Sequence, residues 1–124
     1  DGRIVGRGCT AGLAANDPTA HAESVAIREA SRLLGRFHLD DCELYASCEP
    51  CPMCLGAIYW ARLARVYFAA ARADAGAIGF QDEALYEELA RPPEARALPM
   101  AAMLRDEAAA VFDEWRAWDA RRLY

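Results

Sequence analysis

Two short segments of this 124-residue chain carry side chains that could bind a metal ion. Residues 21–23 read His-Ala-Glu, and residues 50–54 read Pro-Cys-Pro-Met-Cys. Cys51 and Cys54 lie three residues apart in the first turn of a predicted helix, so both thiols can face one point. The partial positive charge at a helix N-terminus also stabilises the thiolates that zinc requires. With His21, the two cysteines provide three ligands of the types that zinc prefers.

Three protein ligands leave the fourth position of a tetrahedral zinc ion for water, which is the arrangement of a catalytic site. Zinc lowers the pKa of a bound water toward neutrality and so prepares a nucleophile. Glu23 lies two residues from His21, where its carboxylate could take the proton of that water and pass it to a substrate atom. The pattern therefore predicts a hydrolytic zinc enzyme in which Glu23 is the catalytic proton carrier.

A closed structural zinc site is the alternative, because Cys48, Cys51 and Cys54 form a C-x-x-C-x-x-C pattern. Together with His21 they could surround a zinc ion completely, as in Cys3His sites that perform no chemistry. Cys48 precedes Pro50 at the end of a predicted strand, so its thiol need not face the same point as the two helical cysteines. The spacing alone leaves both arrangements open.

Strands and helices are predicted to alternate around these segments. The sequence predicts helices at 21–34, 52–61, 81–90 and 106–122, the first and the last from apolar residues at helical spacing. Strands are predicted at 3–9, 42–47 and 65–70, and residues 98–104 are interpreted as a strand, with a helix start as the alternative. Thr19 is the predicted N-cap of the first helix, and Gly35 its C-terminal stop. Loops are predicted at 10–19 and 71–79. Such alternation is typical of a layered α/β domain with parallel strand pairs.

The composition limits the classes of partner. The formal net charge is −5, and all 14 basic residues are arginine. An acidic chain without a basic stretch is a poor candidate for binding nucleic acid, since contacts to phosphate drive that affinity. No apolar run approaches the length of a membrane span, so we expect no membrane partner. The five cysteines and the lack of an opening secretory signal favour reduced thiols and a cytoplasmic location.

The spacing H-x-E…P-C-x-x-C is the signature of the zinc-dependent nucleobase deaminases. In its longer segments the chain resembles the bacterial guanine deaminases, which have the cytidine-deaminase fold. The segments that carry this resemblance are NDPTAHAE (16–23), LDDC (39–42), SCEPCPMCLGAIYWAR (47–62), GFQD (79–82) and FDEWRAW (112–118). They extend over nearly the whole chain.

The resemblance implies an α/β fold, a three-layer αβα domain with a mixed five-stranded sheet. It implies a zinc ion held by His21, Cys51 and Cys54, with Glu23 as the proton shuttle. The implied reaction is the hydrolysis of guanine to xanthine and ammonia, a step of purine catabolism.

The first helix and strand of this fold are missing from the chain. Asp1 and Gly2 form a pair typical of hairpin turns, but no strand precedes them. We therefore interpret residues 1–124 as a single zinc-dependent deaminase domain that is incomplete at its N-terminus, and we expect further residues upstream.

The resemblance also implies how a small nucleobase substrate binds. The backbone N–H of Ala22 would contact the purine carbonyl, and Asp82 and Tyr124 would hold the edge of the base. Relatives exchange their C-terminal segments between two subunits, which implies a homodimer in which Tyr124 serves the partner's site. Thr10 stands where many relatives have a substrate-binding asparagine, and it has a shorter reach and one donor instead of two. Trp60, after the cysteine motif, could wall the pocket or pack in the core.

Three rival functions stay open. A tRNA adenosine deaminase has the same zinc motif but needs a basic surface. The second is a deaminase of another aminated ring, such as cytosine or an aminotriazine, because Thr10 replaces the asparagine that binds substrate in many relatives. A structural zinc module without activity would use Cys48 as a fourth ligand.

Overall fold

The computed structural model describes residues 2–123. The chain divides after Ala90 into two compact units. The first unit contains both predicted metal-binding segments, and the second contains the C-terminal helix.

Two parallel strands form the sheet of the first unit. They are β1 (Glu43–Cys48) and β2 (Arg65–Ala70), and their register runs from Glu43 opposite Arg65 to Cys48 opposite Ala70. Helix α3 (Pro52–Ala61) connects them as the crossover that parallel strands require. The predicted strands at 42–47 and 65–70 and the predicted helix at 52–61 are thereby confirmed, the first strand being shifted by one residue.

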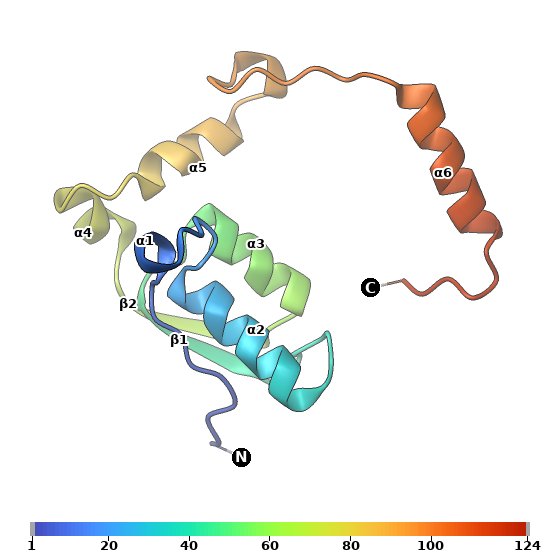
Figure 1. Ribbon diagram of the computed structural model, residues 1–124. Coiled ribbons are helices and arrows are strands. Elements are labelled where there is room, and N and C mark those ends of the chain that lie inside the picture. The colour runs from blue at the N-terminus through green and yellow to red at the C-terminus, as the bar shows by residue number, and fades with distance from the viewer. Residues whose placement is uncertain (1, 124) are drawn as a thin grey trace. The chain divides into compact units, whose positions relative to one another are not determined.

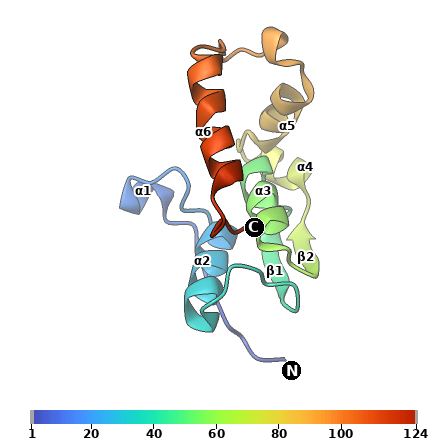
Figure 2. The same ribbon diagram turned by 90° about the vertical axis from the view of Figure 1, so that its right-hand side faces the viewer.

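Helix α2 (Ala22–Leu34) packs beside α3 on one face of this sheet (Figures 1 and 2). The side chains buried between these elements include Ala30, Leu39, Leu44, Ile58 and Ala61. On the opposite face of the strands, the ring of Tyr45 stacks on that of Tyr67, with a centroid separation of 4.7 Å. Among the residues that the structure describes, the sheet therefore has two parallel strands, and the further strands implied by the family resemblance are not formed.

Helix α2 is capped differently from the prediction. Its N-cap is His21, which has extended backbone, whereas Thr19 belongs to the preceding turn. The backbone N–H and the hydroxyl of Thr19 both donate to the Asp17 carboxylate, at 2.8 and 2.7 Å. Because its hydroxyl is bonded within this turn, Thr19 does not cap the helix. At the other end Gly35 has a φ of 63°, which confirms it as the C-terminal stop.

Residues 3–9 do not form the predicted strand. They run along α2, where the Arg7 N–H donates to the Glu29 carboxylate. The glycines of this segment permit the close approach, since a Cβ on Gly6 would lie 2.4 Å from the carbonyl oxygen of Ala26. Strand pairing requires an edge within hydrogen-bonding distance. The edge of β1 that faces this segment is separated from it by a cavity.

Three further helices belong to the first unit, namely α1 (Gly12–Ala15), α4 (Arg72–Ala77) and α5 (Asp82–Ala90). Helix α5 confirms the helix predicted at 81–90. Helices α1 and α4 are short, and they lie in the segments 10–19 and 71–79 that were predicted to be loops. The small residues of these segments show no apolar periodicity from which a helix could be predicted.

The second unit contains η1 (Pro93–Ala95) and α6 (Arg105–Ala117). The strand predicted at 98–104 is wrong, because this segment has no strand partner among the described residues of its unit. The predicted helix at 106–122 ends earlier, at Ala117. Four apolar side chains of α6 and its end are exposed, namely Val111, Phe112, Trp115 and Trp118. No helix among the described residues is long and apolar enough to cross a membrane.

Replacing Gly6 with alanine should destabilise the fold. The new Cβ would lie 2.4 Å from the Ala26 carbonyl oxygen and 3.0 Å from the Ala30 Cβ, so the segment must move away from α2. Overpacking of this kind costs about 1–3 kcal/mol of unfolding free energy. The matched control is Gly56→Ala in α3, where nothing lies within 4 Å of the new Cβ. It should be neutral or stabilise the helix by roughly 0.5–1 kcal/mol. Urea unfolding measures both, and equal stabilities would contradict the prediction.

Candidate metal centre and active site

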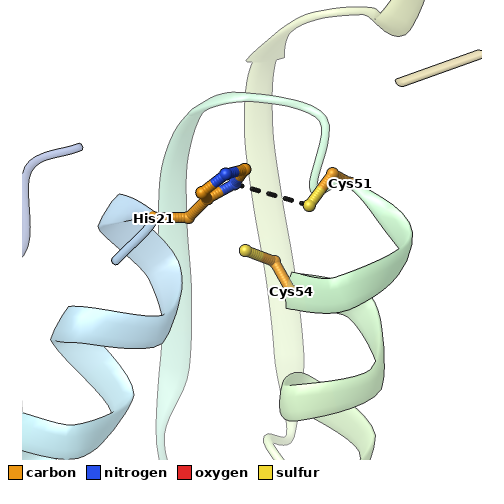
Figure 3. Close-up of side chains that lie close together, drawn as sticks. All are labelled: His21, Cys51 and Cys54. Atoms are coloured by element: carbon orange, nitrogen blue, oxygen red, sulfur yellow. Dashed lines mark hydrogen bonds between the residues drawn. The ribbon is translucent and has the colours of Figure 1, made fainter. Parts of the chain in front are cut away.

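Three side chains from distant parts of the sequence converge at one point. The Nδ1 or Nε2 atom of His21 and the Sγ atoms of Cys51 and Cys54 lie within 4.8 Å of one another. Nδ1 of His21 is 3.5 Å from Sγ of Cys51. Figure 3 shows the three side chains pointing toward a common centre, His21 from one helix and the cysteines from another.

The ends of two helices bring these side chains together. His21 is the N-cap of α2, and Cys51 is the N-cap of α3, with extended backbone at both positions. Pro52 occupies the first turn of α3, where its missing N–H removes no helical bond. Cys54 lies one turn into α3 and therefore on the same side as Cys51. Both helices direct the positive ends of their dipoles at the cluster, which favours anionic ligands there.

The cluster fits a zinc ion in its spacing. Two ligand atoms bonded to one tetrahedral zinc at about 2.0–2.3 Å are roughly 3.3–3.8 Å apart. The separation of 3.5 Å between His21 Nδ1 and Cys51 Sγ lies in this range. One nitrogen and two sulfurs are also a typical zinc donor set for a site that keeps one position open.

The burial of the thiols favours the same conclusion. Cys51 is 4% exposed and Cys54 is 0% exposed. Burial raises the pKa of the Cys54 thiol to about 12, and the nearby Glu23 carboxylate adds to the rise, while a contact with the Ser24 hydroxyl opposes it. Without a cation the Cys54 thiol therefore keeps its proton, and a bound zinc ion would replace that proton and give the buried sulfurs the partner that water cannot provide.

Glu23 lies beside the cluster without belonging to it. The Cys54 thiol donates to Oε2 of Glu23 at 3.5 Å. This carboxylate is half-buried in the first turn of α2. It is therefore within reach of the point where the three ligands converge, as a group that carries protons must be.

Cys48 is directed elsewhere. Its thiol donates to the carbonyl oxygen of Ala71 at 3.9 Å, in a weak contact at the end of β2. The ligand cluster found among residues 2–123 contains His21, Cys51 and Cys54 and leaves Cys48 out. The described geometry is thus an open three-ligand arrangement and differs from the closed Cys3His alternative.

A cavity of about 1770 Å³ opens onto the cluster. The residues predicted to form the site that line it are Thr10, His21, Ala22, Glu23, Cys51 and Asp82. The cavity also extends between residues 2–8 and β1. The structure therefore brings Thr10 and Asp82 to the same hollow as the metal ligands, although they lie far apart in the sequence.

Two predicted site residues are not placed there. Trp60 does not line the cavity, and its side chain is 61% exposed. It lies six residues after Cys54, a spacing that turns it to another side of α3. The expectation that Trp60 walls the pocket therefore has no support in this geometry. Tyr124 lies outside the described residues.

Two neighbours of the site were not predicted from the sequence, Ser24 and Phe80. Ser24 is buried, and its hydroxyl oxygen lies 3.6 Å from Sγ of Cys54. Phe80 lines the cavity. Ser24 directly follows Glu23, but consecutive residues of a helix project about 100° apart, so its position in the sequence gave no signal of this contact. Phe80 had a weak signal, its place two residues before Asp82.

Comparison with known proteins places this geometry among the deaminases. Residues 1–70 match the cytidine and deoxycytidylate deaminase zinc-binding region. The guanine deaminase of Bacillus subtilis is 48% identical over 124 residues, which are 100% of this chain and 80% of that protein. The tRNA-specific adenosine deaminase of Haemophilus influenzae is 41% identical over 76 residues, which are 61% of this chain and 44% of that protein.

A solved structure agrees with these matches. The X-ray structure of guanine deaminase from Bacillus subtilis superimposes with a TM-score of 0.93 and 43% identity, over 100% of this chain and 79% of that chain. The predicted α/β deaminase fold and the predicted resemblance to guanine deaminases are thereby confirmed.

Replacing either buried cysteine with serine should abolish zinc binding. A serine hydroxyl is a poor ligand for zinc, and loss of the metal should also lower the melting temperature, because metal binding is linked to folding. The matched control is Cys48→Ser, which changes the same atom outside the cluster and should keep one zinc per chain. Atomic absorption after gel filtration measures the zinc content. Full zinc content in Cys51→Ser, or its loss in Cys48→Ser, would contradict the three-ligand arrangement.

Proposed function

Because the chain belongs to the cytidine and deoxycytidylate deaminase family, we propose that it hydrolyses guanine to xanthine and ammonia. The observation that carries this proposal is the match to a guanine deaminase at 48% identity over the whole chain. That match includes residues 71–124, which follow the zinc-binding region. It therefore supports the substrate as well as the chemistry.

Zinc is the cofactor of this chemistry, and we propose His21, Cys51 and Cys54 as its ligands. When bound, zinc makes a water molecule acidic enough to act as a nucleophile near neutral pH. The ligands themselves take no part in proton transfer. Their role is to hold the ion at the N-termini of α2 and α3, next to Glu23.

Glu23 is the proposed proton carrier. Hydrolysis forms a bond from the water oxygen to the carbon that bears the amino group, and it breaks the bond from that carbon to nitrogen. One water proton must move to the neighbouring ring nitrogen, where it stays, and the second must move from the new hydroxyl to the departing amine as the carbonyl forms. A single carboxylate beside the ligand cluster can accept and deliver each of these protons in turn.

Three groups around the cavity are proposed to orient the base. The backbone N–H of Ala22 would donate to the purine carbonyl. The Asp82 carboxylate would accept hydrogen bonds from the N–H groups of the base edge. Thr10 can donate or accept a single hydrogen bond at the position where many relatives have asparagine.

The rival substrates are weaker fits. A tRNA would have to approach a chain whose net charge is −5, and contacts to phosphate favour basic surfaces. The match to a tRNA-specific adenosine deaminase also covers a smaller part of the chain, 61%. Another small aminated ring, such as cytosine or an aminotriazine, is the alternative substrate that Thr10 favours, because threonine replaces the asparagine of many relatives. A direct assay decides between these bases.

The assembly that we propose is a homodimer with exchanged C-terminal segments. The exposed apolar side chains of α6, Val111, Phe112 and Trp115, support it, because a partner would remove them from water. Tyr124 would then reach the partner's cavity. We further propose a cytoplasmic location, which agrees with the free cysteines. We also propose a role in purine catabolism, which follows from the proposed hydrolysis of guanine.

Ammonia release from a panel of bases tests the proposed reaction. Guanine should be deaminated faster than cytosine, adenine or an aminotriazine. The variant Glu23→Gln should keep its zinc and lose turnover by about a hundred- to ten-thousand-fold or more, because glutamine keeps the shape but cannot carry a proton. A preference for another base would overturn the assigned substrate. Near-normal turnover in Glu23→Gln would overturn the role of the carboxylate.

Mixed dimers test the exchanged segment. A chain lacking Tyr124 should bind substrate more weakly, by roughly 1–3 kcal/mol for one hydrogen bond and one ring contact. When it is mixed with Glu23→Gln chains, both defects can fall on one site of the dimer and leave the other site whole. The mixture should therefore exceed the summed activity of the two parents once subunits have exchanged. No gain after demonstrated exchange would rule out a tail that acts across the interface.

A further inference from the structure

The turn between β1 and α3 is held by a side chain from α5. The hydroxyl of Tyr86 donates to the carbonyl oxygen of Pro50 at 2.8 Å. Pro50 is buried and directly precedes Cys51, the N-cap of α3. A hydrogen bond at this carbonyl therefore ties α5 to the turn that carries the first cysteine ligand.

A second set of contacts holds the same turn and the same helix. The backbone N–H of Arg72 donates to the Glu49 carboxylate at 3.0 Å, and the Arg72 guanidinium lies 3.5 Å from it. The guanidinium also pairs with Glu83 at 3.4 Å and lies over the Tyr86 ring, 4.4 Å from its centroid. Arg72 thus links the turn, through Glu49, to two residues of α5.

Helix α5 carries a proposed substrate contact on the same face as Tyr86. Asp82 and Tyr86 are four residues apart, so their side chains lie on one side of the helix. Both are half-buried, and Asp82 lines the cavity that opens onto the ligand cluster. The placement of α5 therefore sets the distance between the carboxylate that orients the base and the turn that holds the metal.

We infer that Tyr86 is a positioning residue, whose hydrogen bond to Pro50 fixes the separation between Asp82 and the metal-binding turn. This inference rests on the proposed deaminase function. A base held by Asp82 reacts only when its amino-bearing carbon meets the nucleophile at the right distance, and small displacements reduce the rate strongly. Burial raises the pKa of the Tyr86 phenol, with the Glu49 carboxylate acting in the same direction, so the hydroxyl keeps its proton and remains a donor.

The variant Tyr86→Phe removes the hydroxyl and keeps the ring beneath Arg72. We expect kcat for guanine to fall by about 3- to 10-fold, the effect of one lost hydrogen bond, while KM changes by less than about 2-fold. Zinc content should stay at one per chain. The matched control is Tyr59→Phe on α3, where the side chain is 75% exposed, and its kcat should equal that of the unmodified protein.

A double-mutant cycle separates positioning from general stability. If Tyr86 acts by placing Asp82 relative to the metal, its hydroxyl should matter little once Asp82 no longer holds the base. Adding Tyr86→Phe to Asp82→Asn should then lower kcat by less than about 2-fold, since coupled sites are not additive. A full 3- to 10-fold loss in the Asp82→Asn background would overturn the inference.

A spectroscopic measurement needs no turnover. In cobalt-substituted protein the visible absorption of the thiolate-bound ion depends on ligand geometry. Tyr86→Phe changes where α5 lies relative to the turn and leaves the ligands in place, so its spectrum should match those of Tyr59→Phe and of the unmodified protein. A shifted spectrum would show that the hydroxyl acts on the ligands themselves and would overturn the inference. Failure of the unmodified protein to deaminate guanine would instead refute the proposed function, and the cobalt spectrum would still test whether Tyr86 acts on the ligands.

Discussion

The convergence of His21, Cys51 and Cys54 is the constraint on which the rest of the first unit depends. Two of these side chains are buried thiols, and burying polar groups is costly unless they gain a partner. Helices α2 and α3 pack against each other, and Ala30 and Ala61 are buried with Leu39 in the core toward their C-terminal ends. Close packing of the two helices is therefore what holds the ligand atoms within reach of one ion.

The parallel strands explain why the remaining site residues gather at the same end. In a parallel sheet, the carboxyl ends of neighbouring strands meet at one edge, and sites form there. The metal-binding turn follows β1, and α4 follows β2 directly. Segments that leave the two strands thus meet beside the cluster. The bond from Arg72 to Glu49 is the direct consequence, since it joins the second residue after β2 to the first residue after β1.

Local patterns predicted the parts of this site that local chemistry determines. The H-x-E and P-C-x-x-C spacings singled out the three side chains that the structure brings together. A proline in the first turn and an acidic segment pointed to α3 and α5. The strands predicted at 3–9 and 98–104 failed because a strand exists only with a partner edge, which no local pattern supplies. Tyr86 was missed for a similar reason. Its role depends on a carbonyl 36 residues away, and a tyrosine in an acidic helix gives no sign of that contact.

Charge balance explains why this site is built where two helices begin. Two thiolates and the Glu23 carboxylate bring three negative charges together when a divalent cation is bound. The cation offsets two of them, and each helix N-terminus contributes roughly half a positive charge. The sum is close to neutral, although Cys51 and Cys54 are buried from water. Placing Glu23 in the first turn of α2 therefore allows a third anionic group beside the metal ligands without a further cation. In that position the carboxylate needs no arginine partner to balance its charge, and it can exchange protons with substrate.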